Sequence, residues 1–272
     1  MAQTVLITGT STGIGRETAK LFQSRGWNVV ATMRGPENET ELNTLKGVRL
    51  LRLDVTDEAS IRESVTSAVC EFGSIDVLVN NAGFGSFGLL EATPMDAIRE
   101  QFETNVVGLL ATTKAVLPHM RARRQGVIVN ISSMGGRIGF PLGALYHGSK
   151  FAVEGLSEAL SYELAAAGIR VKIVEPGMVR TDFSGRSARF SDDEALVEYR
   201  DVVANFADGY ASISSSPPAE PDEVASTIFT AATDGTDQLR YVSGKDGAAL
   251  IARRQQEDDA TFSAFLRTAF KI

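Results

Sequence analysis

The chain has little cysteine, little histidine and no long apolar run. Its single cysteine, Cys70, excludes an intramolecular disulfide and leaves no thiolate cluster for zinc or an iron–sulfur centre. Its two histidines, His119 and His147, have no second ligand at a useful spacing, so we expect neither a metal site nor a catalytic histidine. The apolar runs are too short for a signal peptide or a membrane span. These absences are typical of a cytoplasmic protein, and the apolar pattern around Cys70 predicts a buried thiol.

Charge and length limit the partners and the number of domains. The chain carries 27 lysine and arginine residues against 34 aspartate and glutamate residues, a net charge of −7, which argues against nucleic acid or an anionic membrane as a partner. With 43% hydrophobic and 22% charged residues, the composition is that of a globular protein. The length of 272 residues suits one doubly wound α/β domain over residues 1–272.

Short apolar runs alternate with helical patterns along the chain. The runs are rich in β-branched residues and do not alternate cleanly with polar ones, as in parallel strands that are buried on both faces. They cover residues 4–8, 29–32, 48–53, 77–79, 127–131 and 171–174, and the helical patterns cover 14–25, 58–71, 95–124 and 144–167. This succession predicts a Rossmann-type, doubly wound parallel β-sheet that binds its ligands at the carboxyl ends of the strands.

The pattern changes after Pro176. Residues 184–221 mix polar and aromatic side chains, with a helical stretch near 192–206 and a break rich in serine and proline. Because this segment follows the carboxyl end of a strand, we expect it to form a helical substrate lid within the single domain. A helix at 222–232, a last strand at 239–242 and further helix are expected after it.

A glycine-rich turn joins the first strand to the first helix. Its sequence is Thr8-Gly9-Thr10-Ser11-Thr12-Gly13-Ile14-Gly15. The glycines would let the backbone turn tightly and approach a pyrophosphate at the helix N-terminus. Arg34 ends the second run, where no carboxylate is present to bind an adenosine ribose, so it favours the 2′-phosphate of NADP. The alternative is a solvated arginine in a loop.

Polar residues also follow the third and fourth runs. Asp54-Val55 ends the third run, and Asn81-Ala82-Gly83 follows the fourth. Both groups stand at carboxyl ends of strands, where adenine and the rest of a dinucleotide would lie. The alternatives are a turn residue for Asp54 and a structural amide for Asn81.

Tyr146 and Lys150 are the most informative pair in the chain. Residues four apart on a helix share a face, where an ammonium would lower the pKa of a phenol and let it give and take a proton. Ser133, at the end of the fifth run, would face Tyr146 and donate to a substrate oxygen. Asn105 lies inside a helical pattern, a poor place for an amide unless something is bonded to it. Taken alone, such a tyrosine–lysine pair is more often a surface contact, so the other motifs must decide.

Together, these residues resemble the short-chain dehydrogenase/reductase family. The glycine turn, Asn80-Asn81-Ala82-Gly83, Asn105, Ser133, Tyr146, Lys150 and Pro176-Gly177 occur in the order and spacing of that family over residues 4–182. The resemblance implies that Tyr146 is the proton donor or acceptor, and that Lys150 holds the nicotinamide ribose and lowers the pKa of Tyr146. It also implies that Ser133 orients the carbonyl and that Asn105 keeps a water in a proton relay to Lys150.

The resemblance further implies a set of residues around the dinucleotide. Thr181 would hydrogen-bond the nicotinamide carboxamide, and Val179 would lie against it. The expected cofactor-binding residues are Gly9, Ser11, Thr12, Gly13, Ile14, Gly15, Arg34, Asp54, Val55, Asn81, Ala82, Gly83, Tyr146, Lys150, Pro176, Gly177, Val179 and Thr181.

Two departures from the family pattern refine the cofactor and the branch. Many NADP-preferring members carry a basic residue immediately before the second motif glycine, and here that residue is Thr12, so Arg34 stands alone. We expect a preference for NADP(H) with tolerance of NAD(H). The chain also lacks the Asp-Gly-Gly ending of 3-oxoacyl-carrier-protein reductases, and its helical tail resembles the 17β-hydroxysteroid and retinol dehydrogenase-like branch.

The expected substrate is a small apolar ketone or aldehyde, or the matching secondary alcohol. Apolar side chains flank the predicted catalytic residues, namely Phe84, Phe87, Met134, Phe140, Leu142, Met178 and Phe183, although single members of this set can equally pack the fold. The expected reaction is hydride transfer with Tyr146 as general acid or base. The resemblance implies homodimers or homotetramers built on the helices at 95–124 and 144–167.

Three alternatives remain open from the sequence. A dinucleotide-binding sensor or regulator would keep the fold with vestigial catalysis, although such proteins usually lose the tyrosine or the lysine. A 3-oxoacyl thioester reductase would use the same residues but has a different carboxyl end. A nucleotide-sugar epimerase of the larger related group would need a bigger carboxyl-terminal substrate domain.

Overall fold

The computed structural model describes residues 2–182, 185, 187–214 and 216–272. Within these residues, seven strands form one parallel sheet in the order β3-β2-β1-β4-β6-β7-β9. The strands are β1 (Thr4–Thr8), β2 (Asn28–Met33), β3 (Val48–Arg52), β4 (Val77–Asn80), β6 (Gly126–Ile131), β7 (Ile169–Pro176) and β9 (Arg240–Ser243). The strand order reverses beside β1, as in a Rossmann-type doubly wound sheet, so the predicted fold class is confirmed.

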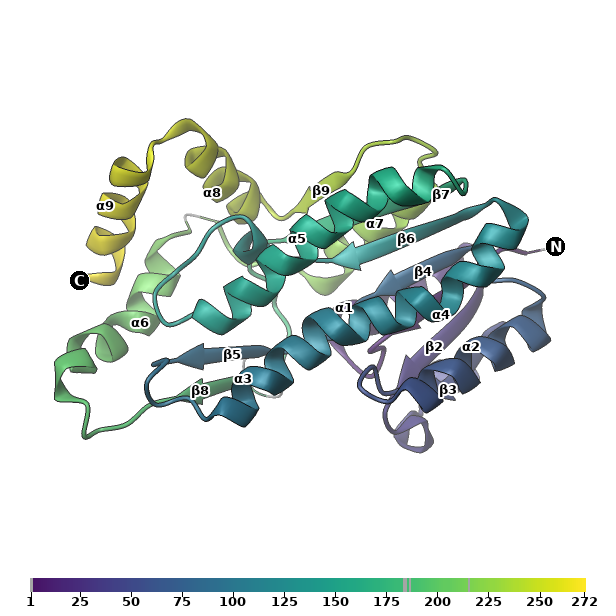
Figure 1. Cartoon of the computed structure of the whole chain (residues 1–272), viewed down its shortest axis with the longest axis horizontal. Helices are drawn as coiled ribbons and strands as arrows, with labels where there is room; N and C mark the ends of the chain where they lie inside the picture. Colours follow the sequence, from purple (N-terminus) through teal and green to yellow (C-terminus); the bar gives the residue numbers. More distant parts are fainter. Residues whose placement is uncertain (1, 183–184, 186, 215) are drawn as a thin grey trace.

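Helices cover both faces of the sheet (Figure 1). On one face lie α1 (Gly13–Ser24) and α7 (Pro221–Thr233), and on the other lie α2 (Glu58–Phe72), α4 (Gly108–Arg123) and α5 (Ala144–Ala165). Successive residues of a strand point to opposite faces of the sheet. Val5 and Ile7 pack in the core beneath α1, whereas Leu6 packs in the core beneath α2. Burial on both faces explains why the strands read as continuous apolar runs.

The helix predicted at 95–124 is interrupted. α3 (Met95–Phe102) and α4 are joined by a π-helical turn, Glu103–Val107, which contains Asn105. A π-helical turn adds one residue to a helical turn and is frequent at functional sites. Hydrophobic periodicity does not reveal it, because the chain continues in helical conformation on both sides.

The prediction of a buried thiol is wrong, because Cys70 is exposed. On α2, the buried residues Ile61, Val65 and Ala68 define the face that packs on the sheet. Cys70 follows Ala68 by two residues, which turns its side chain by about 200° around the helix and away from that face.

The segment at 184–221 contains an unexpected strand and a shifted helix. β8 (Ala188–Ser191) pairs in parallel with β5 (Gly85–Gly88), forming a small second sheet. The helix expected near 192–206 forms later, as α6 (Arg200–Ser212). Ser184, the predicted start of the lid, and Phe183, predicted to flank the catalytic residues, lie outside the described residues.

The carboxyl-terminal helices complete the same end of the molecule. α8 (Lys245–Gln256) and α9 (Asp259–Phe270) follow β9, and α9 packs on α6. Gly209 makes this approach possible, since a Cβ there would lie 2.4 Å from Cδ1 of Phe270. The small β5–β8 sheet and α6 lie on the side to which the arrow of β6 points (Figure 1). The segments predicted to surround substrate therefore gather at the carboxyl ends of the strands.

The core beneath α1 depends on the ring of Phe22. This residue is fully buried, and its ring makes edge contacts with Trp27 and Phe229 at centroid distances of 5.1 and 4.9 Å. The Phe22→Ala variant should lower the free energy of unfolding by about 3–5 kcal/mol, because it removes a buried ring and leaves a cavity. Urea denaturation measures this change. The control Phe190→Ala, at a residue that is 48% exposed, should change it by about 0.5 kcal/mol or less.

Candidate active site

The glycine turn between β1 and α1 has no room for side chains. Gly9 and Gly13 have φ angles of +72° and +56°, in the region that favours glycine. A Cβ at Gly15 would lie 2.3 Å from the carbonyl oxygen of Gly9 and 2.5 Å from Nδ2 of Asn81. The turn can therefore close only with glycine at these positions.

The first turn of α1 offers free N–H groups. Thr12 is the N-cap residue, but its side chain makes no capping hydrogen bond, and the first turn contains no acidic residue. Ser11 and Thr12 are exposed there. Uncapped N–H groups at the positive end of a helix dipole bind phosphate groups, so this cradle fits the pyrophosphate of a dinucleotide.

Asn81 fastens the end of β4 to the end of β1. Its Nδ2 donates to the carbonyl oxygens of Thr8 and Gly9 at 2.9 and 3.0 Å. The Thr8 hydroxyl accepts from the N–H groups of Asn81 and Ala82, each at 3.0 Å. These bonds give the side chain of Asn81 a structural place, and they give Thr8, which opens the glycine-turn motif, a bonding role that the motif alone does not predict.

The residues expected around adenosine fall on the same edge of the sheet. Asp54 forms a turn, since its Oδ1 accepts from the N–H and hydroxyl of Thr56 at 3.0 and 2.8 Å. Val55 lies against α4, where a Cβ on Gly108 would approach it to 2.8 Å. Arg34 directly follows β2 and is exposed.

The segment after β7 returns to the glycine turn. The N–H of Gly177 donates to Ser243 at 2.8 Å, and the N–H of Met178 donates to the carboxylate of Asp246 at 2.6 Å. Val179 follows and forms a bridge with Ala219. A Cβ on Gly13 would lie 3.3 Å from Cγ2 of Thr181, so Thr181 borders the glycine turn.

Tyr146 and Lys150 occupy the first two turns of α5. The Nζ of Lys150 lies 5.9 Å from the centre of the Tyr146 ring and donates to the carbonyl oxygen of Ile131 at 2.9 Å. Ser133 is hydrogen-bonded to Tyr146, and its hydroxyl also accepts from the N–H of Gly135 at 3.0 Å. The structure thus brings the end of β6 and the start of α5 together around one phenol.

Asn105 braces the loop before β5 through its side chain. Its Oδ1 accepts from the N–H of Phe84 at 3.0 Å, and its Nδ2 donates to the carbonyl oxygen of Phe84 at 2.8 Å. Nδ2 also lies 3.1 Å from the hydroxyl of Ser149 on α5. These bonds satisfy the amide inside the helix and link Asn105 to the helix that carries Tyr146 and Lys150.

The sequence and the structure of the chain match known proteins. A model of the short chain dehydrogenase family matches residues 3–191. An uncharacterised oxidoreductase of Schizosaccharomyces pombe is 40% identical over 237 residues, which cover 85% of this chain and 97% of that protein. Human retinol dehydrogenase 8 is 34% identical over 287 residues, which cover 99% and 90% of the two chains.

Two solved structures give the same result. A short-chain dehydrogenase from Streptomyces avermitilis superposes with a TM-score of 0.86 at 34% identity, covering 98% of this chain and 97% of that one. ElxO with NADP bound has a TM-score of 0.74 at 32% identity, covering 89% and 98%. The chain belongs to the short-chain dehydrogenase/reductase family. It is accordingly an oxidoreductase acting on CH–OH donors with a nicotinamide dinucleotide.

Burial controls the charges in the candidate active site. It raises the pKa of Tyr146, and the hydrogen bond with Ser133 offsets only part of this effect. The direction is opposite to the lowering expected from Lys150. Burial also lowers the pKa of Lys150 to about 8, against which the charge of Glu154 acts. Because Lys150 itself is desolvated, its positive charge is only partly retained at alkaline pH.

Aromatic rings of the dehydrogenase lie next to Tyr146. The ring of Phe87 lies 5.2 Å from that of Tyr146 and 6.3 Å from that of Phe206. Phe206 stacks with Tyr210 at 6.1 Å, and Phe140 meets Tyr210 edge-on at 6.1 Å. Burial raises the pKa of Tyr210, and the nearby Tyr146 raises it further. Phe206 and Tyr210 were missed because the pairing of β5 with β8 brings α6 over the site.

His147 has a structural place beside the site. Its Nδ1 lies 2.9 Å from the carbonyl oxygen of Gly135, and its ring meets Phe140 edge-on at 5.0 Å. Burial lowers the pKa of His147, which favours the neutral imidazole. The contacts fix the loop between β6 and α5.

A ladder of amides connects the sheet to both long helices. Nδ2 of Asn80 on β4 donates to Asn130 on β6 at 2.9 Å and to Thr113 on α4 at 3.0 Å. Nδ2 of Asn130 donates to Ser157 on α5 at 2.8 Å. The signal for this role in the sequence is an asparagine inside an apolar run, because a buried amide needs a hydrogen-bond partner.

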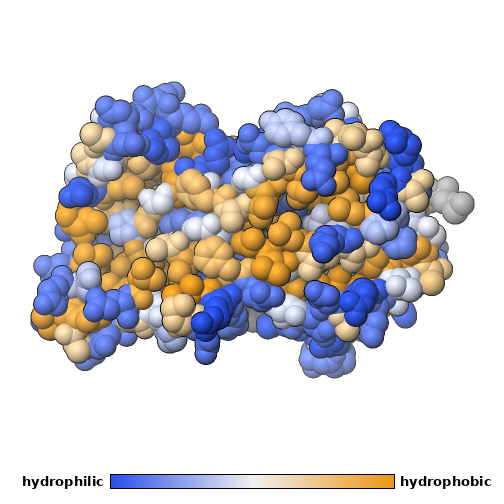
Figure 2. Space-filling view, viewed as in Figure 1, coloured by the Kyte–Doolittle hydropathy of each residue, from blue (hydrophilic) through white to orange (hydrophobic). Residues whose placement is uncertain are grey.

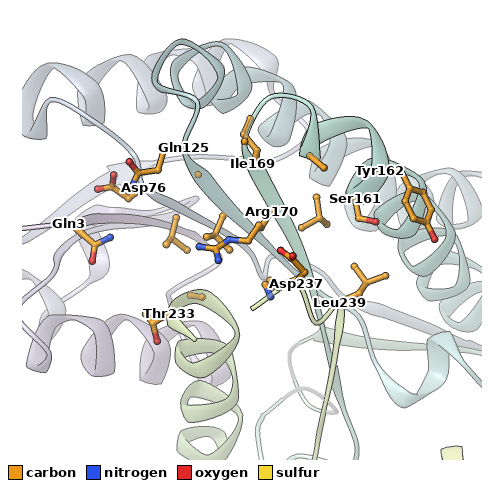
Figure 3. Close-up of a pocket in the computed structure, with 18 of the residues that line it drawn as sticks. Gln3, Asp76, Gln125, Ser161, Tyr162, Ile169, Arg170, Thr233, Asp237 and Leu239 are labelled. Atoms are coloured by element: carbon orange, nitrogen blue, oxygen red, sulfur yellow. The ribbon is translucent and has the colours of Figure 1, made fainter. Parts of the chain in front are cut away.

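A cavity of about 680 Å³ opens at the opposite end of the sheet (Figure 3). Its lining includes residues next to the amino ends of several strands, namely Gln3, Asp76, Gln125 and Ile169. Doubly wound sheets bind their ligands at the carboxyl ends, and Tyr146 does not line this cavity. The cavity is therefore separate from the candidate active site.

The close approach at Gly15 gives a test of the cofactor cradle. The Gly15→Ala variant should bind NADPH about tenfold more weakly or worse, because a Cβ 2.3 Å from the Gly9 carbonyl oxygen must open the turn. Fluorescence titration with NADPH measures the affinity. Gly139→Ala is the control, since a Cβ there meets no atom within 4 Å, and its affinity should equal that of the wild type.

Proposed function

We propose that the chain is an NADP(H)-dependent oxidoreductase that reduces the carbonyl of a hydrophobic ketone or aldehyde, or oxidises the matching secondary alcohol. The observation that carries the proposal is the phenol of Tyr146, hydrogen-bonded to Ser133 and held beside Lys150, with the ring of Phe87 next to it. A proton-transferring group next to an apolar surface suits the chemistry of an apolar carbonyl.

Each residue of this set has one part in the proposed reaction. The bound dinucleotide supplies or accepts the hydride. Tyr146 gives a proton to the carbonyl oxygen during reduction, and its raised pKa keeps it protonated near neutral pH. Ser133 donates a hydrogen bond to the same oxygen and fixes its position, while Lys150 holds the ribose and stabilises the phenolate that forms.

Asn105 has a supporting part in this proposal. Because its side-chain amide is bonded to the main chain of Phe84, it holds the loop that leads to β5 and Phe87. A water relay to Lys150, as the family resemblance implies, is then proposed to use the main chain of the π-helical turn rather than the side chain of Asn105.

The proposed preference for NADP(H) rests on Arg34. Arg34 is exposed and directly follows β2. An acidic residue at this position would repel a 2′-phosphate, whereas the guanidinium attracts it. Arg16, on α1, is instead engaged by Glu39 and Glu41. The NADP bound to ElxO, a structural relative, supports the same preference, and we propose NAD(H) as a weaker alternative cofactor.

The segment at 184–221 is proposed as the substrate lid. β8 extends along β5, and Arg189 forms an ion pair with Glu100 of α3 while its guanidinium lies 5.0 Å from the centre of the Phe84 ring. α6 brings Phe206 over Phe87. These contacts support a lid that encloses an apolar substrate above Tyr146.

We further propose homodimers or homotetramers formed through α4 and α5. Apolar side chains gather across the face where these helices lie (Figure 2). Val107, Phe151 and Tyr162 are 46%, 48% and 74% exposed on this helical layer.

Among the described residues, no helix combines the length and the apolar content needed to cross a bilayer. The cytoplasmic location stays a prediction.

The Tyr146→Phe variant tests the proposed proton transfer. It should lose carbonyl reduction by about 100-fold or more, because the ring remains but the proton donor is gone. NADPH oxidation is followed at 340 nm across a panel of apolar ketones, aldehydes and diketones. The affinity for NADPH, measured separately, should be nearly unchanged.

Two outcomes would contradict this assignment. Activity of the variant close to that of the wild type would remove Tyr146 from the chemistry. Tight binding of NADPH without turnover of any carbonyl by the wild type would favour the dinucleotide-binding sensor.

The Arg34→Ala variant tests the cofactor preference. Loss of the charge-assisted hydrogen bonds to a 2′-phosphate should weaken NADPH binding about tenfold and leave NADH binding unchanged. Isothermal titration with both dinucleotides measures the difference. Arg62→Ala, on the exposed face of α2, should alter neither affinity, and an equal loss for NADPH and NADH in Arg34→Ala would refute the preference.

A further inference from the structure

A group of charged side chains is buried next to Lys150 and has no part in the roles proposed above. Glu154 of α5 and Glu175 of β7 are 5% and 0% exposed. Carboxylates are rarely buried to this extent unless they are paired. Oε1 of Glu154 and Oε2 of Glu175 nevertheless have no hydrogen-bond partner within the described parts of the chain.

Two arginines hold the other carboxylate oxygens. Nε of Arg240, on β9, donates to Oε2 of Glu154 at 2.9 Å and lies 3.5 Å from Oε1 of Glu175. Arg137, after the turn at Met134–Gly136, donates to Oε1 of Glu175 at 2.9 Å. The same Arg240 also donates to Glu158, which lies one helical turn beyond Glu154 and is less buried.

Glu154 lies one helical turn after Lys150 on the same side of α5. Both residues crowd against Gly136, where a Cβ would lie 3.0 Å from Cγ of Glu154 and 3.0 Å from the carbonyl oxygen of Lys150. Lys150 and Glu154 are only 9% and 5% exposed, so a charge on Glu154 acts on Lys150 with little screening by solvent. Consistent with this, the Glu154 charge raises the pKa of Lys150 against the lowering by burial.

We infer that Glu154 is a positioning residue for the reaction: its buried carboxylate is the counter-charge that keeps Lys150 protonated during turnover and thereby sets the upper pH limit of carbonyl reduction. The inference rests on the proposed function, because that function requires a charged Lys150 beside Tyr146.

The second buried carboxyl group of the cluster, Glu175, has a pKa set by several neighbours. Burial raises the pKa of Glu175, and the charge of Glu154 raises it further, whereas Arg137 and Arg240 lower it. Glu175 is thus the carboxyl group whose proton uptake is favoured as the pH falls. Along α5, Glu154 is the carboxylate nearest to Lys150.

The protonation of Lys150 can be measured without dinucleotide or substrate. Lysine labelled with ¹³C at Cε gives signals for the seven lysines, and the Lys150 signal is the one that Lys150→Arg removes. In the wild type its titration midpoint should lie at about 8. Glu154→Gln should move the midpoint about one pH unit lower, because an opposing charge is removed.

Glu158→Gln is the matched control, since Glu158 binds the same arginine from the next turn of α5. Its Lys150 midpoint should equal that of the wild type. Glu154→Asp keeps the charge, so its Lys150 titration midpoint should lie close to that of the wild type. An unchanged midpoint in Glu154→Gln would overturn the inference.

A second variant covers the case in which Glu154→Gln does not fold, as judged by circular dichroism. Arg240→Gln removes the cation that shares the charge of Glu154, so the Lys150 midpoint should move higher, opposite in sign to the effect of Glu154→Gln. A midpoint that stays or falls would contradict the inference.

The pH profile of reduction tests the consequence for turnover. With NADPH and a ketone that the wild type reduces, kcat/KM should fall as the pH rises through the Lys150 midpoint, and in Glu154→Gln this fall should begin about one pH unit lower. A merely structural defect would lower kcat/KM at every pH without moving the fall.

The two readouts separate the two possible failures. If the wild type reduces no carbonyl, the proposed function fails, and the titration still tests Glu154. If the wild type is active but neither the titration nor the profile moves in Glu154→Gln, the inference fails and the proposed function stands.

Discussion

The ladder of buried amides on β4 and β6 is the interaction on which the site geometry depends. Asn80 and Asn130 are directly paired across the two strands, and each reaches one long helix, through Thr113 and Ser157. Leaving one of these buried groups unpaired would cost about 1–3 kcal/mol. The ladder therefore fixes how α4 and α5 lie on the sheet. Because α5 carries Tyr146 and Lys150 in its first two turns, the ladder also fixes the positions of the phenol and the ammonium.

A second constraint is that the charges of the site are buried. Desolvation acts on Tyr146 and Lys150 in the same sense, favouring the neutral form of each. A neutral phenol is ready to donate a proton, but a neutral lysine would be of no use to the phenolate that results. The inferred counter-charge for Lys150 in this protein is the buried carboxylate of Glu154.

Much of the fold and part of the site could be predicted from local sequence. The strands were found because both of their faces are buried, and the glycine turn because only glycine fits its φ angles and contacts. The errors arose where neighbouring elements decide. Cys70 continues an apolar pattern but points away from the sheet, and the π-helical turn at Asn105 leaves no trace in periodicity. The pairing of β8 with β5 depends on residues about a hundred positions apart.

The sequence by itself determined the order along the chain of the strands in the main sheet and the identity of the residues at their ends, because these follow from periodicity, glycine geometry and motif spacing. Only the tertiary structure decided the direction of the Tyr146 pKa, the bracing roles of Asn81 and Asn105, and the cover that α6 gives the site. The physical reason is that desolvation and hydrogen-bond partners are properties of the space around a side chain. That space is filled by residues that lie far away in the sequence.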